Sequence, residues 1–219
     1  MPTRIVPLVN GEYYHVFNRG VARMPIFLTN RDYERFKNTF TYYKYPHKFA
    51  KFSVSFSKDE LIKSSENIIE IVSYCLMPNH FHFLLKQTKD NGIMNFIRMT
   101  TISYAKYFNI KRKRKGPLFE GQFKVVHVES NEQLLHLSRY IHLNPIVSHV
   151  INDLDLFKWS SYLEYLQKTS EVICANEIIL DQFKSIDSYE KFVLDHKEYG
   201  EKLENIKHLI LEETDFPDV

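Results

Sequence analysis

The segment that most limits the possible folds is a pair of apolar runs separated by Pro78 and Asn79. Residues 68–77, IIEIVSYCLM, are rich in β-branched and aromatic side chains, and residues 81–87, FHFLLKQ, resume the same pattern. Proline and asparagine together favour a turn between two strands. We therefore predict a β-hairpin over residues 68–87 and, with it, an antiparallel sheet.

Further strand and helix patterns surround this hairpin. The apolar spacing and the turn residues place them at residues 13–20 (strand), 30–45 (helix, with Asn30 as N-cap and Pro46 beyond its end), 91–108 (helix), 124–130 (strand) and 132–144 (helix). The order βαββαβ, followed by one more helix, predicts an α+β fold of the ferredoxin-like (RRM-like) type. In this fold an antiparallel sheet carries two helices on one face.

Composition excludes several classes of protein. The chain has 219 residues, of which 44% are hydrophobic, and this is enough to build a core. Its 2 cysteines lie far apart in the sequence, which argues against a disulfide framework and against a cysteine-rich zinc site. No apolar run approaches the roughly 20 residues that span a bilayer, and the N-terminus lacks the apolar stretch of a signal peptide. We therefore expect a cytoplasmic protein with no membrane partner.

Charge is distributed unevenly along the chain. Residues 150–219 carry 7 Lys and Arg against 16 Asp and Glu, whereas the preceding residues carry 22 against 11. We predict a domain over residues 1–165, of which residues 1–149 form the basic body, and an acidic, mostly helical C-terminal extension over residues 166–219. A basic body favours a polyanionic partner.

The strongest basic cluster is KRKRK at residues 111–115, which we expect to form a loop. Such a loop could track phosphates, and aromatic rings near it could stack on unpaired bases, although a solvated charged loop is as good an interpretation. The candidate DNA-binding residues are Arg19, Arg23, Lys111, Arg112, Lys113, Arg114, Lys115, Phe119 and Lys124.

Two histidines stand near the start of the second hairpin strand. His80 and His82 are two residues apart, so they share one face of the strand at a Cα separation of roughly 7 Å. Two imidazoles at this spacing can converge on one metal ion. Taken alone, such a pair is more often two partly exposed histidines at the start of a strand. A third, oxygen ligand would favour Mg²⁺ or Mn²⁺.

The helix predicted over residues 132–144 ends in YIHLNP. Tyr140 and Asn144 are four residues apart and therefore project from the same helical face, whereas His142 faces elsewhere. Asn144 could offer an amide oxygen to a metal, and Tyr140 could offer its phenol to whatever the metal holds. The alternatives are a core tyrosine and a helix-ending Asn-Pro turn.

Taken together, these motifs resemble one family. YHVFNRG, LMPNHFHFLL, GPLFEGQFKVVHVES, LSRYIHLNP and KWSSYLEY are similar to segments of the single-tyrosine HUH transposases, in particular the REP-associated tyrosine transposases, over roughly residues 10–165. The resemblance implies a metal-dependent enzyme that cleaves and rejoins single-stranded DNA beside hairpins through a 5′-phosphotyrosine link.

The resemblance also assigns roles to individual residues. It implies that His80 and His82 hold Mg²⁺ or Mn²⁺, that Tyr140 is the nucleophile, and that Asn144 stands at the third ligand position. Insertion-sequence members usually have Gln or Glu there, so the shorter amide predicts a weaker ligand. The partner implied is hairpin-forming single-stranded DNA, and a homodimer is possible.

Two other functions fit the same residues. A non-catalytic module could bind single-stranded nucleic acid through the basic loop and aromatic rings alone. A metal-dependent phosphoesterase could use water in place of Tyr140. Metal-dependent formation of a covalent adduct would distinguish the transposase from both.

Overall fold

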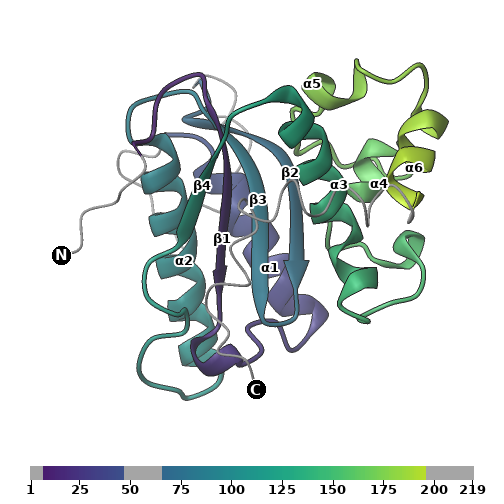
Figure 1. Ribbon diagram of the computed structural model, residues 1–219. Helices are drawn as coiled ribbons and strands as arrows, with labels where there is room; N and C mark the ends of the chain where they lie inside the picture. Colours follow the sequence, from purple (N-terminus) through teal and green to yellow (C-terminus); the bar gives the residue numbers. More distant parts are fainter. Residues whose placement is uncertain (1–6, 47–65, 196–219) are drawn as a thin grey trace, which may run out of the picture.

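The computed structural model of the protein describes residues 7–46 and 66–195. Its centre is a sheet in the order β2-β3-β1-β4 in which every neighbouring pair is antiparallel (Figure 1). The strands are β1 (Tyr13–Arg19), β2 (Ile69–Met77), β3 (His80–Gln87) and β4 (Lys124–Val128). The predicted hairpin is confirmed: Met77 pairs with His80, and Pro78 and Asn79 form the turn between them.

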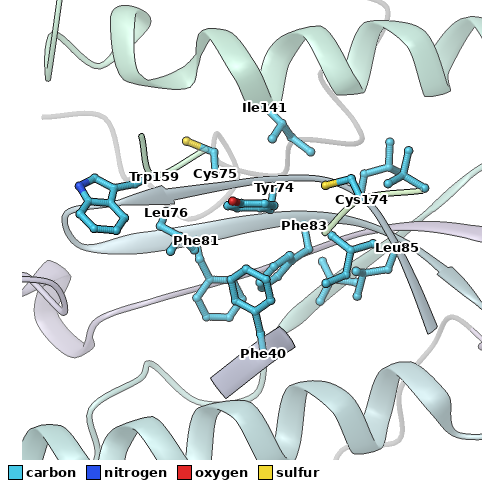
Figure 2. Packing of buried hydrophobic residues seen from close by; sticks show 14 of the residues in the cluster. Phe40, Tyr74, Cys75, Leu76, Phe81, Phe83, Leu85, Ile141, Trp159 and Cys174 are labelled. Carbon is cyan, nitrogen blue, oxygen red and sulfur yellow. The ribbon is translucent and has the colours of Figure 1, made fainter. Parts of the chain in front are cut away.

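Two helices cover one face of this sheet, as the ferredoxin-like arrangement predicts. They are α1 (Asn30–Tyr43) and α2 (Gly92–Lys111), which contact each other. The core on this face is largely aromatic: Phe36 of α1 lies 5.2 Å from Phe81 and 5.0 Å from Tyr104, measured between ring centroids. Figure 2 shows Phe40, Phe81 and Phe83 packed together below the sheet.

The helix α3 (Asn131–Val147) lies on the opposite face of the sheet and packs mainly on β2. In Figure 2 its residue Ile141 stands above the strands, on the same side as Cys75. The helix ends three residues later than predicted, because Pro145 is accommodated inside it and buried. Helix α3 thus covers the β2–β3 half of this face, and we call this face the α3 face.

The chain after α3 borders the sheet at β2. Trp159 accepts a hydrogen bond from the Leu76 amide at 2.9 Å, and the Ala175 amide donates to Ile71 at 2.8 Å. These contacts occupy the outer edge of β2, which would otherwise present unpaired backbone groups. The short elements of this region are η2 (Leu154–Leu156), α4 (Tyr162–Tyr165), α5 (Glu177–Leu180) and α6 (Ile186–Leu194).

Some predicted boundaries differ from the structure. Helix α1 is capped by Thr29, not Asn30, because Thr29 forms a reciprocal capping box with Asp32. Lys111 is the last residue of α2 and not part of a loop. A one-turn helix, η1 (Val21–Arg23), follows β1.

The C-terminal extension is helical only in part where it is described, since residues 167–176 are irregular. Residues 196–219 of the predicted extension lie outside the described residues. Within the described part of the chain, no helix is long and apolar enough to cross a membrane.

Candidate functional site

The two histidines of β3 lie side by side on the α3 face. His80 and His82 share this face because side chains alternate along a strand, and their ring centroids are 4.8 Å apart at an interplanar angle of 88°. Strand β1 pairs Arg19 with His80 and Phe17 with His82, so these two side chains also point to the α3 face. The predicted pairing of the two imidazoles on one face is what the structure shows.

Helix α3 brings the two predicted polar residues to these histidines. The ring of Tyr140 stands nearly perpendicular to that of His82, at 85° with centroids 5.6 Å apart. One turn further on, the Asn144 side-chain nitrogen lies 3.4 Å from His82 Nε2. Both helical residues are buried, with 4% of each exposed. The two histidines of β3 and the two polar residues of α3 therefore form one cluster, although His82 and Asn144 are 62 positions apart in the sequence.

The histidines present neutral nitrogens suited to a metal ion. Burial, together with the neighbouring Arg19 charge, lowers the pKa of His80 to about 4 against a smaller opposing effect of Asn144. Burial and the adjacent His80 and His15 lower the pKa of His82 as well. A neutral imidazole keeps a lone pair on one ring nitrogen, which is the form that binds metals.

An unsatisfied atom marks where a ligand would fit. His80 Nδ1 faces the Asn79 side-chain oxygen at 2.6 Å, so Nδ1 carries the proton. The other nitrogen, His80 Nε2, is buried and has no hydrogen-bond partner among the described residues. No group of three or more His, Cys, Asp or Glu side chains in the described ranges could hold a metal. The donors that could hold an ion here are the two imidazoles and the Asn144 amide.

Sequence reasoning missed two residues of the cluster, both on β1. His15 is fully buried, and its Nε2 lies 3.0 Å from His82 Nδ1. Phe17 is half-buried and its ring lies 4.7 Å from that of His15 and 5.8 Å from that of His82. Alternation along residues 13–19 places both on one face, but only the pairing of β1 with β3 shows that this face is the one with His82.

Part of the predicted basic loop is bound within the protein. Lys111 Nζ and Arg112 Nη2 contact the two carboxylate oxygens of Asp32 at 2.6 and 2.9 Å. Arg114 donates to the Asn109 side chain and to the backbone oxygens of Gly116 and Pro117. These three side chains stabilise the end of α2 and the turn that follows it.

Two of the remaining basic residues, Arg19 in the register of β1 and Arg23 in η1, lie near the end of the sheet that carries His80. Lys113, Lys115 and Lys124 are exposed, as is Arg23 in η1. Arg19 is bonded through its Nε to Glu120. The Arg23 carbonyl accepts a hydrogen bond from Asn79 at 3.3 Å, which places η1 beside the β2–β3 turn.

Phe119 is positioned differently from the other candidate DNA-binding residues. Its side chain is 8% exposed and packs between Phe81 and Tyr104, with centroids 5.8 and 6.4 Å away. The predicted role in stacking on bases does not fit this position, because the ring completes the core under α2. Phe17, which is half-buried on the α3 face, offers the more accessible ring.

Comparison with solved structures shows a similar fold. A solved structure titled as a REP-associated tyrosine transposase bound to a REP hairpin is similar over 80% of this chain and 90% of its own, with 14% identity and a TM-score of 0.57. This similarity shows a shared fold.

Two weaker similarities are a putative transposase from Deinococcus radiodurans and a tRNA(His) guanylyltransferase from Saccharomyces cerevisiae. The first has 15% identity, 64% and 95% coverage of the two chains and a TM-score of 0.37. The second has 10% identity, 99% and 85% coverage and a TM-score of 0.39. The comparison with curated proteins gives no match.

The family model described as "Transposase IS200 like" matches residues 9–144, which contain both histidines, Tyr140 and Asn144. The match covers more than half of the chain and ends at the last residue of the cluster. The chain belongs to the IS200-like transposase family and is an enzyme of the transposase class.

Proposed function

We propose that this transposase cleaves and rejoins single-stranded DNA at hairpin-associated sites, with Tyr140 as the nucleophile and Mg²⁺ or Mn²⁺ held by His80, His82 and Asn144. The observation that carries the proposal is the contact of the Tyr140 ring with His82 at 5.6 Å. It places a phenol beside the histidine pair, which is what nucleophilic attack on a phosphate at this site requires. A similar fold in a structure titled as bound to a REP hairpin supports the choice of DNA.

In the proposed cleavage the Tyr140 hydroxyl attacks the scissile phosphorus. A bond forms between the phenolic oxygen and phosphorus while the bond from phosphorus to the 3′ oxygen breaks. The phenol loses its proton and the leaving oxygen gains one, so the products are a 5′-phosphotyrosine and a free 3′-hydroxyl. Attack by a 3′-hydroxyl reverses the step, which is why strand transfer needs no external energy source.

An ion bound at this site would stabilise the negative charge that develops on the phosphate and help to orient it. The protein's own contribution is to hold the ligands: Asn79 orients His80, and α3 carries Asn144 and Tyr140 on one face. Because only 4% of Tyr140 is exposed, the ring has to move when a strand enters.

The strand would approach from the part of the α3 face that α3 leaves open. Arg19 and Lys124 lie on this face by strand register, and the exposed Lys113 and Lys115 lie in the loop between α2 and β4. These side chains would contact phosphates. Phe17 would lie next to a nucleotide bound beside His82, because its ring contacts that histidine.

An adduct assay tests the proposal. The protein is incubated with labelled single-stranded hairpin DNA from the flanks of its own gene and Mn²⁺ or Mg²⁺, and is then run on a denaturing gel. We expect a labelled protein band that requires the metal, disappears in Tyr140→Phe and persists in Tyr13→Phe. Tyr13 is a suitable control because it is a half-buried tyrosine on the same face of the sheet.

Two outcomes would contradict the proposal. Cleavage that survives Tyr140→Phe without any adduct would indicate that water is the nucleophile. Tight binding of the same DNA without cleavage or adduct would indicate a binding module.

A further inference from the structure

His15 is the buried residue of the cluster for which the proposed chemistry has no role so far. It lies in the middle of β1 and is fully buried, and its ring plane is within 17° of the plane of His82. Its Nε2 faces His82 Nδ1 at 3.0 Å. The two residues are 67 positions apart, so the contact is made only through the pairing of β1 with β3.

We propose that His15 is a positioning residue that accepts a hydrogen bond from His82 Nδ1 and so leaves His82 Nε2 as the nitrogen that binds the metal. The inference rests on the proposed function, because it concerns the metal site of the same reaction. It adds a residue outside the donor set of His80, His82 and Asn144.

The hydrogen-bonding partners on both sides of His82 support this protonation. Two facing neutral ring nitrogens share one proton, so either His15 or His82 donates. On the other side of the ring, the Asn144 side-chain nitrogen, which can only donate, lies 3.4 Å from His82 Nε2. In this orientation the Asn144 oxygen lies 3.3 Å from the Ser148 hydroxyl, which can donate a hydrogen bond to it. With the amide in this orientation, His82 Nε2 is the acceptor and the proton is on Nδ1, facing His15.

A bound metal requires the same protonation of His82, although the Asn144 amide has to turn over to offer its oxygen to the ion. The nitrogen that binds a metal must be free of its proton, and a metal-binding histidine commonly donates its other N–H to a neighbouring acceptor. With His15 in place, His82 is in the metal-binding tautomer before any ion arrives. Without it, the buried Nδ1–H group would lose this acceptor, which favours the other tautomer.

The second histidine follows the same rule with a different partner. His80 Nδ1 faces the Asn79 oxygen at 2.6 Å, and its Nε2 is the buried nitrogen without a hydrogen bond. Each ligand is thus oriented through Nδ1, His80 by its neighbour in sequence and His82 by a distant strand. Two separate hydrogen bonds thus leave Nε2 of both histidines available to a metal, as a preorganised pair of ligands requires.

The test compares four full-length proteins: wild type, His15→Leu, His15→Gln and His136→Leu. Leucine removes the acceptor, whereas glutamine restores one through its amide oxygen. His136 is a buried histidine of α3 that contacts Phe192, so His136→Leu controls for the loss of a buried imidazole away from the cluster. Two readouts are used without DNA: Mn²⁺ affinity by electron paramagnetic resonance, and the tautomer of His82 by long-range ¹H–¹⁵N NMR.

We expect wild-type His82 to carry its proton on Nδ1. His15→Leu should weaken Mn²⁺ binding by roughly 10- to 100-fold and move that proton to Nε2, while His15→Gln and His136→Leu stay within a few-fold of wild type. The proposal is overturned if wild-type His82 is protonated on Nε2, or if folded His15→Leu binds Mn²⁺ as tightly as wild type.

The two readouts separate this proposal from the one on which it rests. If wild type binds no Mn²⁺, metal dependence fails, yet the NMR measurement on wild type still decides the role of His15. If His15→Leu does not fold, the wild-type tautomer and the affinity of His15→Gln remain decisive.

Discussion

The Nδ1 atom of His142 lies 2.8 Å from the Tyr189 hydroxyl, and this contact joins α3 to α6. On its other side, His142 Nε2 lies 2.7 Å from Ser161 Oγ in the segment that borders β2. All three side chains are fully buried. The residues that follow α3 in the sequence therefore stabilise the helix that carries Tyr140, through hydrogen bonds to His142.

This contact predicts a loss of stability when the Tyr189 hydroxyl is removed. We expect Tyr189→Phe to lower the free energy of unfolding by about 1 to 3 kcal/mol, because a polar nitrogen of His142 is left buried without its partner. Urea denaturation measures the change. Tyr13→Phe, which alters a half-buried ring, should change stability by less than about 0.5 kcal/mol. Equal effects of the two substitutions would contradict the assigned role of the hydroxyl.

A negative charge in place of the Asn144 amide should couple stability to the metal. Asn144→Asp places a carboxylate at a position that is 4% exposed, beside two neutral imidazoles. Without metal we expect the variant to unfold at a lower temperature than wild type, because a buried charge lacks a counter-ion. Mn²⁺ should raise its melting temperature more than that of wild type, since a carboxylate is a better ligand than an amide. Scanning calorimetry with and without Mn²⁺ measures the two melting temperatures. An equal increase for Asn144→Asp and for wild type would argue against a metal at Asn144.

The basic residues near the end of α2 should fall into two groups. Lys113 and Lys115 are exposed and form no ion pair with the described residues, so the double change to alanine should weaken single-strand binding. The slope of log K against log salt should fall by about 1.4, because each phosphate contact contributes roughly 0.7. Filter binding at several salt concentrations measures the slope. An unchanged slope would exclude both residues from the DNA interface.

Lys111→Met is the matched comparison for that experiment. Its amine lies 2.6 Å from Asp32, whose side chain is fully buried, so we expect the substitution to reduce stability. The cost should be about 1 to 3 kcal/mol, since a buried carboxylate loses one of its charged donors. A smaller salt slope without a loss in the free energy of unfolding would place Lys111 in the DNA interface.

Asp32 also predicts how stability depends on pH. Burial alone would raise the pKa of its carboxyl group, but hydrogen bonds from Lys111, Thr29, Tyr107 and the Leu28 amide outweigh burial and lower the pKa to about 2. Because the folded pKa lies below the value of 3.8 in the unfolded chain, the stabilisation is complete above about pH 4 and is lost as the pH falls toward 2.

The measurement is the difference in unfolding free energy between wild type and Asp32→Asn as a function of pH. We expect a difference on the order of 2 kcal/mol at pH 7 that narrows between pH 4 and pH 2. A difference that stays constant through this range would show that the carboxylate charge does not stabilise the fold.

Local patterns in the sequence were sufficient to predict the main strands and helices and to predict that each of the two pairs of site residues shares one face. Alternation in a strand places His80 and His82 on one face, and the period of a helix places Tyr140 and Asn144 on one face, because both spacings are properties of the backbone itself. The Pro78-Asn79 turn likewise indicates the hairpin, since turn residues act through their own backbone preferences. Four strands and three helices could be ordered on this basis.

Only the tertiary structure decided which other residues these faces contact. His15 contacts His82, Lys111 binds Asp32 and Phe119 enters the core because strands and helices distant in sequence are packed together, and no local period encodes such pairings. Pro145 stays inside α3 for the same reason: the packing that buries it outweighs the loss of one helical hydrogen bond. The sequence by itself determined which side chains can act together on one element, and the tertiary structure determined which of them share a site, because contact between elements depends on the packing of the whole chain.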